Sequence, residues 1–151
     1  MKRITITTAL LFLISTPCFA DIISVTTRTA DIVSIPTAEA SYVVLRVPLY
    51  YPLSYSGESK NNFLHVEDFQ GRQGWIHESS ISDAATVVVT GNNVNIRRGP
   101  ATNTPTLFKA KKGVAFSLIQ QQGNWLEVKH ESGRKGWIYK DLTWGGTAPA
   151  E

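Results

Sequence analysis

The sequence predicts an all-β protein made of two tandem small β-barrels. Its apolar segments are short, rich in Val, Ile, Tyr and Thr, and separated by clusters of Gly, Pro, Asn and Ser, with no long stretch that keeps a helical period. Segment 63–76 (FLHVEDFQGRQGWI) and segment 125–138 (WLEVKHESGRKGWI) align 62 residues apart without a gap and are identical in seven of fourteen columns. Unrelated segments would share roughly one column, so we infer a duplicated unit of about 60 residues.

The first twenty residues are typical of a secretory signal peptide. Lys2 and Arg3 precede an apolar stretch, 4–14, and the segment closes on a small residue, Ala20. The apolar stretch is too short to span a bilayer, which takes about 20 apolar residues. We therefore expect residues 1–20 to be removed and the remaining chain, which has no predicted membrane span, to be periplasmic.

Cys18 offers an alternative, because a lipidated cysteine at such a junction would anchor the protein to a membrane. Ser15 and Pro17 argue against a lipoprotein junction. With cleavage after Ala20, no cysteine remains in the mature chain. Neither a disulfide nor a thiol nucleophile is then available.

The first predicted module covers residues 21–83. Its strands are expected at 31–35, 42–46, 49–55, 63–68 and 74–77. The alignment of the two units predicts that this module is shorter by roughly seven residues, because it lacks a piece corresponding to IRRGPATNTP in the second unit. We therefore expect it to present a plainer ligand face.

The second predicted module covers residues 84–145. Its strands are expected at 86–90, 94–97, 107–110, 114–121, 125–130 and 135–139. Turns are expected at 91–93, 99–100 and 123–124, where Gly, Asn and Pro gather. Residues 146–151 are predicted to form a flexible tail.

The last hairpin of each unit sets which side chains face inward. Segment 131–133 (ESG) fits a three-residue loop that ends in a left-handed glycine, although a two-residue loop would exchange the two faces. The three-residue loop predicts a core face of Leu126, Val128 and Ile138. It predicts an outer face of Trp125, Glu127, Trp137 and Tyr139, and in the first unit of Phe63, His65, Trp75 and His77.

Charge divides the chain into two unlike halves. Without Lys2 and Arg3 the net charge is +1, which calls for no nucleic-acid partner. Residues 21–83 carry 4 basic and 8 acidic groups, and residues 84–151 carry 9 basic and 4 acidic groups. Such halves would attract each other or dock an anionic partner on the second half, and chance drift of surface charge is the alternative.

The second unit resembles a bacterial Src-homology-3-like (SH3b) domain. The motifs that carry the resemblance are an Asn-x-Arg-x-Gly-Pro loop, a Gly-x-Trp-x-x-Val strand and a closing Gly-Trp-Ile strand. Their residues are Asn95, Arg97, Gly99 and Pro100, then Gly123, Trp125 and Val128, then Gly136, Trp137 and Ile138. The first unit joins this resemblance through the repeat alone and lacks the Asn-x-Arg-x-Gly-Pro residues.

The resemblance implies a compact barrel of five to six strands. In exported bacterial proteins such a barrel often stands beside a cell-wall hydrolase domain and binds peptidoglycan or a partner peptide. Fold analogy fixes the class of activity better than the ligand.

The mature sequence predicts no catalytic residues, no metal site and no cofactor. Its three histidines, His65, His77 and His130, align with Glu127, Tyr139 and Asp68, so no histidine position is filled by histidine in both units. Two histidines on one outer face make a weak metal site without matching carboxylates. We therefore predict a non-enzymatic protein.

The candidate ligand-binding residues combine cations, an amide and aromatic rings, which binding hot spots favour. They are Asn95, Arg97, Arg98, Trp125, Trp137 and Tyr139. Arg97, Arg98, Lys109, Lys111 and Lys112 form the main basic cluster, which is either a solvated face or a seat for carboxylates. Two functions remain open: a binding module for peptidoglycan or the cell envelope, and an adaptor that holds a periplasmic protein.

Overall fold

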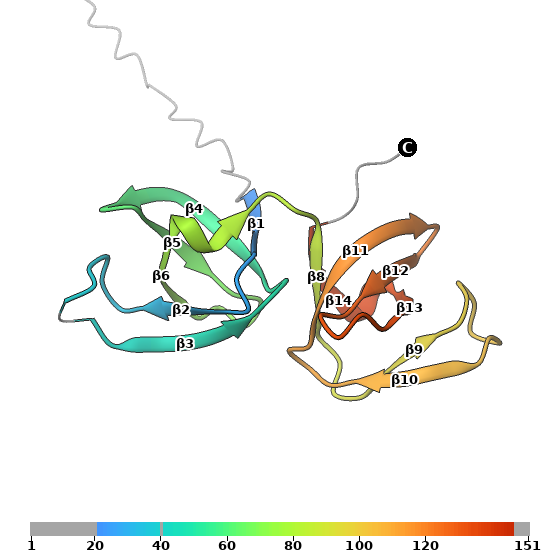
Figure 1. Ribbon diagram of the computed structural model, residues 1–151. Coiled ribbons are helices and arrows are strands. Elements are labelled where there is room, and N and C mark those ends of the chain that lie inside the picture. The colour runs from blue at the N-terminus through green and yellow to red at the C-terminus, as the bar shows by residue number, and fades with distance from the viewer. Residues whose placement is uncertain (1–20, 40, 147–151) are drawn as a thin grey trace, which may run out of the picture.

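The computed structural model describes residues 21–39 and 41–146 and is all-β (Figure 1). Its strands form two seven-stranded antiparallel sheets, accompanied by two short 3-10 helices. The predicted signal peptide and residues 147–151 of the predicted tail lie outside the described residues. Within the described part of the chain, no helix has the length and apolar character needed to cross a membrane.

The two sheets have the same strand order. The first contains β1 (Asp21–Val25), β2 (Thr29–Val33), β3 (Val43–Pro48), β4 (Pro52–Lys60), β5 (Phe63–Glu67), β6 (Gln73–His77) and β7 (Ile81–Ser82), with 3-10 helix η1 (Glu78–Ser80) before β7. The second contains β8 (Thr86–Val89), β9 (Val94–Arg97), β10 (Thr106–Ala110), β11 (Ala115–Gln122), β12 (Trp125–Lys129), β13 (Lys135–Tyr139) and β14 (Thr143–Gly145), with η2 (Lys140–Leu142) before β14. The orders β3-β2-β6-β5-β4-β1-β7 and β10-β9-β13-β12-β11-β8-β14 correspond strand for strand. The prediction of two tandem small β modules is confirmed.

The prediction that the first module lacks a loop is wrong. The connection from β2 to β3 covers 34–42 and is one residue longer than the connection from β9 to β10, which covers 98–105. Both connections close with the same backbone hydrogen bond, from Ser34 N–H to the Tyr42 carbonyl and from Arg98 N–H to the Pro105 carbonyl. The prediction failed because it placed the first strand of the unit at 31–35, and so missed β1 at Asp21–Val25 and shifted the alignment of the units.

Segment 49–55 is also not one strand. β4 begins only at Pro52, and the chain turns before it at Tyr50, whose φ is 68°. The equivalent turn of the second module has Gly113 with φ 89°. A tyrosine rarely adopts a left-handed conformation, so the apolar sequence LYYPLSY gave no sign of a turn at Tyr50.

The final hairpins have the predicted three-residue loops. In the second module, His130 N–H donates to the Arg134 carbonyl and Gly133 N–H donates to the His130 carbonyl, both at 2.9 Å. Gly133 and its counterpart Gly71 have φ of 85° and 80°. Leu126, Val128 and Ile138 are consequently fully buried, as predicted.

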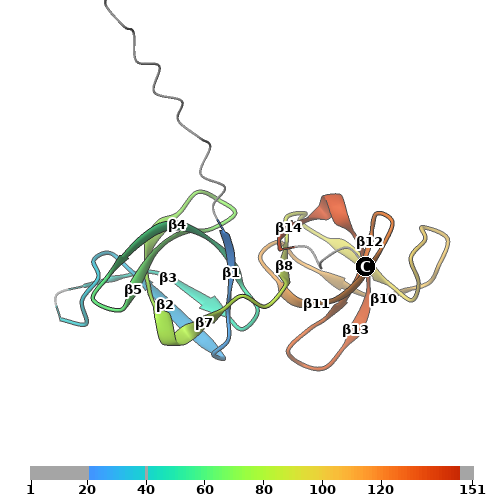
Figure 2. The ribbon, with the colours of Figure 1, turned by 90° about the horizontal axis from the view of Figure 1, so that it is seen from above.

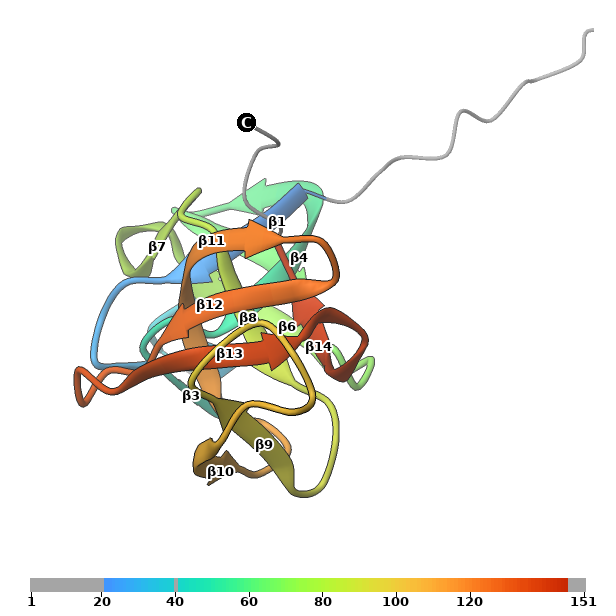
Figure 3. The same cartoon turned by 90° about the vertical axis from the view of Figure 1, so that its right-hand side faces the viewer.

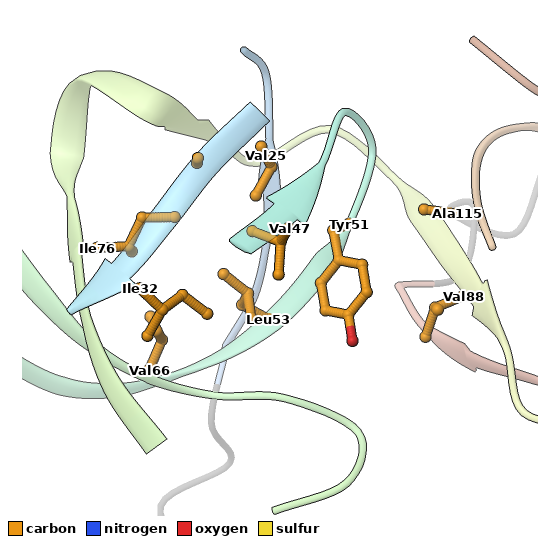
Figure 4. Close-up of a cluster of buried hydrophobic side chains, with 10 residues drawn as sticks. Val25, Ile32, Val47, Tyr51, Leu53, Val66, Ile76, Val88 and Ala115 are labelled. Carbon is orange, nitrogen blue, oxygen red and sulfur yellow. The ribbon is translucent and has the colours of Figure 1, made fainter. Parts of the chain in front are cut away.

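Strand β8 contributes to both hydrophobic cores. Val87 and Val89 belong to the core of the second module. Val88, between them, is fully buried on the opposite face of β8, in the cluster of the first module that contains Leu53 and Tyr51. Figure 4 shows Val88 and Ala115, from the second module, beyond the ring of Tyr51. This burial on both faces explains the unbroken apolar run in β8, since alternation marks a strand with one wet face.

Polar contacts close the same junction. The Ser24 hydroxyl on β1 lies 2.6 Å from the Thr86 hydroxyl on β8 and donates to the Ala84 carbonyl at 2.5 Å. Ser24 and Thr86 are each only 1% exposed. Strands β1 and β8 face each other here (Figure 2), so the two modules meet through a buried interface rather than through a loose linker.

Two glycines of the repeat allow the last strand of each hairpin to cross close to another strand. A Cβ at Gly136 on β13 would lie 2.6 Å from Ile96 Cγ2 and 2.9 Å from the Arg97 carbonyl oxygen on β9. A Cβ at Gly74 on β6 would lie 2.6 Å from Ile32 Cγ2 and 2.8 Å from the Val33 carbonyl oxygen. The glycine of the shared Gly-Trp-Ile sequence therefore makes the same close packing contact in each module.

We expect Gly136→Ala to destabilise the second module by about 2–3 kcal/mol, because the added carbon overpacks a backbone contact. Equilibrium denaturation in urea measures the change. Gly123→Ala is the control, since Gly123 has φ 58° and nothing within 4 Å of a new Cβ, so only backbone strain of about 1 kcal/mol is introduced. Equal losses in the two variants would contradict the close-approach explanation.

Candidate functional site

The second module carries a surface groove of about 450 Å³ where its loops meet. Figure 3 looks onto this module, with β11, β12 and β13 side by side and β9 and β10 beyond β13. Ten residues line the groove: Gly91, Asn92, Asn93, Val94, Asn95, Arg97, Thr102, Trp125, Tyr139 and Leu142. They come from the β8–β9 turn, β9, the β9–β10 loop, the start of β12, the end of β13 and η2.

The Asn-x-Arg-x-Gly-Pro loop is held by hydrogen bonds of its own residues. The Arg97 guanidinium donates from Nη1 to the Thr104 carbonyl at 2.8 Å. The Thr104 hydroxyl contacts the carbonyls of Gly99 at 3.0 Å and Ala101 at 2.8 Å. One N–H of Arg97 therefore fixes the loop, and the other donors of its fork remain for a ligand in the groove.

An aromatic pair also lines the groove. Trp125 and Tyr139 are directly opposite each other in the β12–β13 ladder, and their rings pack edge to face with centroids 5.4 Å apart. Lys140 N–H donates to the Asn124 carbonyl at 2.8 Å and so ties the end of β13 to the turn before β12. Both rings remain partly exposed, so they offer flat apolar surface to a ligand.

Four of the six candidate ligand-binding residues line the groove: Asn95, Arg97, Trp125 and Tyr139. Arg98 is exposed at the start of the β9–β10 loop and is not among the lining residues. Trp137 is opposite Glu127 on β12 and opposite Arg97 on β9, on the predicted outer face but outside the groove. The ligand-binding role of all six residues stays a prediction, and the structure places four of them in one groove.

The predicted basic cluster is divided between two places. Arg97 lines the groove, and Lys109 is opposite Asn95 on the edge strand β10. Lys111 and Lys112 instead line hollows at the junction of the two modules. Lys111 and Lys112 therefore do not line the groove with Arg97, although they follow the edge strand β10 in sequence.

Sequence reasoning missed the polar rim of the groove. Asn92 and Asn93 lie in a segment that the sequence marked only as a turn. Thr102 lies in the IRRGPATNTP loop but was not singled out, and Leu142 lies in η2, which was not predicted. The Gly-Asn-Asn turn directly before β9 was the available signal, because loops on a rigid scaffold carry most binding residues.

The first module holds a related aromatic pair with a different charge arrangement. Phe63 and His77 are opposite each other on β5 and β6, and their rings meet edge to face at 5.1 Å. Asp31 has the place that Asn95 has in the second module, and it forms a bidentate ion pair with Arg46 at 2.6 and 2.9 Å. The hydrogen bond from Arg46 and its positive charge hold the pKa of Asp31 below its usual value against a small opposing effect of burial.

Each histidine of the described chain has a serine partner. The Nδ1 atoms of His65, His77 and His130 lie 3.2, 2.8 and 2.9 Å from the hydroxyls of Ser56, Ser79 and Ser132. Within residues 21–39 and 41–146, no three His, Cys, Asp or Glu side chains gather in a way that would hold a metal ion.

The groove lies within a segment that matches a known domain family. Residues 90–145 match the model of the bacterial SH3 domain. This segment begins at the β8–β9 turn and ends with β14, so it contains every candidate residue named above. The match confirms the resemblance of the second unit and does not extend to the first module.

Two curated relatives match a similar length of chain. The probable cell wall amidase LytH of Staphylococcus epidermidis is 35% identical over 60 residues, which cover 39% of this chain and 20% of that protein. The putative N-acetylmuramoyl-L-alanine amidase YrvJ of Bacillus subtilis is 30% identical over 61 residues, which cover 40% of this chain and 12% of that protein. The chain thus spans a fifth or less of the length of these relatives.

Among solved structures, NlpC2 from Trichomonas vaginalis is similar over 83% of this chain and 48% of its own, with 15% identity and a TM-score of 0.38.

Proposed function

We propose that the chain is an exported, non-catalytic protein that associates with the cell wall by binding peptidoglycan in the groove of its second module. The observation that carries the proposal is the groove itself. Inside the segment that matches the bacterial SH3 domain, it brings Asn95 and Arg97 together with the rings of Trp125 and Tyr139. Its role in the periplasm rests on the signal peptide that the sequence predicts.

The side chains of the groove suit the chemistry of peptidoglycan. Stem peptides carry carboxylates, which the planar fork of Arg97 binds through two parallel hydrogen bonds. Asn92, Asn93, Asn95 and Thr102 offer amide and hydroxyl groups to peptide and sugar. The faces of Trp125 and Tyr139 cover apolar surface of the ligand, as aromatic anchors do at binding hot spots.

The similarity to cell wall amidases supports the same proposal. The names of LytH and YrvJ describe proteins that act on the wall, and the part shared with this chain is about 60 residues of each. A shared binding module would bring different chains to the same polymer. The catalysis of those proteins does not follow from this part.

We expect Trp125→Ala to lower the amount of protein that co-sediments with purified sacculi by about tenfold or more, since truncation of an aromatic hot spot costs about 2 kcal/mol or more. Sedimentation across a range of protein concentrations measures the affinity.

Phe63→Ala is the matched control, because it removes one ring of the equivalent edge-to-face pair in the first module. It is expected to leave sedimentation unchanged. Wild-type protein that sediments no more than an unrelated protein would refute wall binding, and equal losses in the two variants would refute the groove as the site. Hydrolysis of muropeptides by the purified protein would refute the non-catalytic part of the proposal.

A further inference from the structure

The junction between the two modules contains three neighbouring hollows of about 400, 320 and 430 Å³. The first and second share Pro48 and Lys112, and the first and third share Leu49 and Glu131. We call these three hollows together the junction trough. It is lined from both modules and contains none of the groove residues of the proposed wall-binding site.

Cations gather along this trough. The first module carries more acids than bases, yet three of its four basic side chains, Arg28, Arg46 and Arg72, line the trough. The second module adds Lys111 and Lys112 from the β10–β11 turn. Like charges at one junction repel each other, so this arrangement favours an anion between them.

The acidic groups at the trough neutralise only part of this charge. Asp31 pairs with Arg46 and Asp68 pairs with Arg72. Each pair uses two of the five N–H donors of its guanidinium, and the Arg46 and Arg72 side chains are 66% and 43% exposed. Glu131 lies where the first and third hollows meet. The two lysines make no ion pair within 4.0 Å among the described residues.

The trough also offers apolar surface between the cations. Leu45, Pro48 and Phe69 line its second hollow, and Lys112 Nζ lies 5.9 Å from the centre of the Phe69 ring. The buried contacts of Val88, Ser24 and Thr86 fix the modules against each other, so the trough exists before a ligand binds. Preformed sites at domain junctions are a common place for ligands.

We propose that the junction trough binds an extended acidic peptide segment of a partner protein, in which carboxylates alternate with apolar side chains. Three hollows in series, with cations along an apolar lining, match such a segment. A glycan strand would present hydroxyls to Leu45, Pro48 and Phe69 and leave their apolar surface without a complement. The trough would then hold a protein while the groove of the second module holds the wall.

The test uses the whole protein and a fluorescent synthetic peptide that alternates glutamate and leucine. We expect wild-type protein to bind it at low salt, with affinity that falls as salt screens the cations. The peptide with glutamine in place of glutamate is expected not to bind. Lys111→Gln combined with Lys112→Gln should weaken binding about tenfold, which corresponds to about 1.4 kcal/mol.

Lys129→Gln combined with Lys135→Gln is the matched control. It removes the same charge from an exposed cross-strand pair of the second module. Binding within about twofold of wild type is expected for it, since neither lysine lines any of the three hollows and exposed charges outside the site are screened. Equal losses in the two double variants, or no binding of the acidic peptide by wild type, would overturn the proposal.

Sedimentation with sacculi separates this site from the proposed wall-binding groove. Lys111→Gln with Lys112→Gln is expected to leave sedimentation unchanged, and Trp125→Ala is expected to leave peptide binding unchanged. Loss of sacculus binding in the lysine variant would mean that the trough serves the wall and would overturn the peptide proposal. If wild-type protein does not sediment with sacculi but binds the acidic peptide, the wall-binding proposal fails and the peptide proposal stands.

Discussion

Val88→Asp is expected to unfold both modules together. Val88 is fully buried, and although it belongs to β8 of the second module, it packs in the core cluster of the first. An aspartate there must either remain charged in an apolar environment or take up a proton, and the expected loss is about 4 kcal/mol or more. Because Val88 belongs to a strand of one module and to the core of the other, both modules should lose stability.

The neighbouring residue provides a control within the same strand. Val87 faces the core of the second module. Val87→Ala is expected to destabilise the second module by about 1–3 kcal/mol and to leave the first largely protected, whereas Val88→Ala should lower the protection of both. Hydrogen exchange followed by mass spectrometry resolves the two modules, since peptides from 21–82 and 86–145 report separately.

Full protection of the first module in Val88→Asp would mean that the modules fold independently and that the shared cluster contributes little. Loss of protection in both modules would make the pair one cooperative unit. In that case the arrangement of the junction trough is part of the native fold.

Much of the second module could be predicted from its own residues. The repeat fixed its hairpin, and the glycine at position 133 correctly indicated which faces of β12 and β13 are buried. The predicted strand at 94–97 coincides with β9, and the predicted strand at 135–139 coincides with β13. These segments combine strong alternation with clear turn residues, which is where local sequence determines structure best.

The first module was predicted less well because its turns lack the usual signals. Tyr50 adopts a left-handed conformation that the second module gives to a glycine, so sequence alone placed a strand across it. β1 was missed although its residues, DIISV, favour a strand, because it pairs with β4 and β7, which are distant in sequence, and no hairpin turn marks it.

The candidate site was partly predictable for a related reason. The motif residues Asn95 and Arg97 and the ring pair Trp125 and Tyr139 follow from the strand register. The loop residues that line the groove beside them do not follow from the register. The positions of 91–93 and 102 depend on the packing of two separate connections. The position of Lys111 and Lys112 at the junction depends on the contact between modules, which leaves no local pattern in the sequence.

Asp68→Asn is expected to destabilise the first module by about 3 kcal/mol, since loss of the buried carboxylate leaves the donors that point at it without their complement. The Asp68 side chain is fully buried. Its carboxylate accepts hydrogen bonds from the Arg72 guanidinium, from the backbone N–H groups of Gln70 and Arg72 at 2.9 Å, and from the Tyr51 hydroxyl at 3.3 Å. Asparagine keeps the shape of the side chain but loses the charge and one acceptor.

The same contacts make part of the stability of the first module depend on acid. Burial acts to raise the pKa of Asp68, but the hydrogen bonds from Arg72 and Gln70 outweigh it, and the pKa is lowered. A carboxyl group with a lower pKa in the folded state stabilises the fold above its unfolded pKa of about 4, and this contribution disappears as the pH falls through the folded value. The wild type should therefore lose its advantage over Asp68→Asn as the pH falls below about 4, whereas the difference stays constant between about pH 5 and 8.

Urea denaturation of both proteins at a series of pH values measures this difference. The second module offers an internal control, because the position equivalent to Asp68 holds His130 and the arginine equivalent to Arg72, Arg134, instead lies 3.9 Å from the centre of the Phe108 ring. Arg134→Gln should therefore lower stability by a smaller amount, about 1 kcal/mol, with no dependence on acid pH. A difference between wild type and Asp68→Asn that persists unchanged at the lowest pH would show that the carboxylate charge is not what stabilises this turn. The effect would then come from the exchange of a carboxyl oxygen, which accepts hydrogen bonds, for an amide NH2 group, which only donates them.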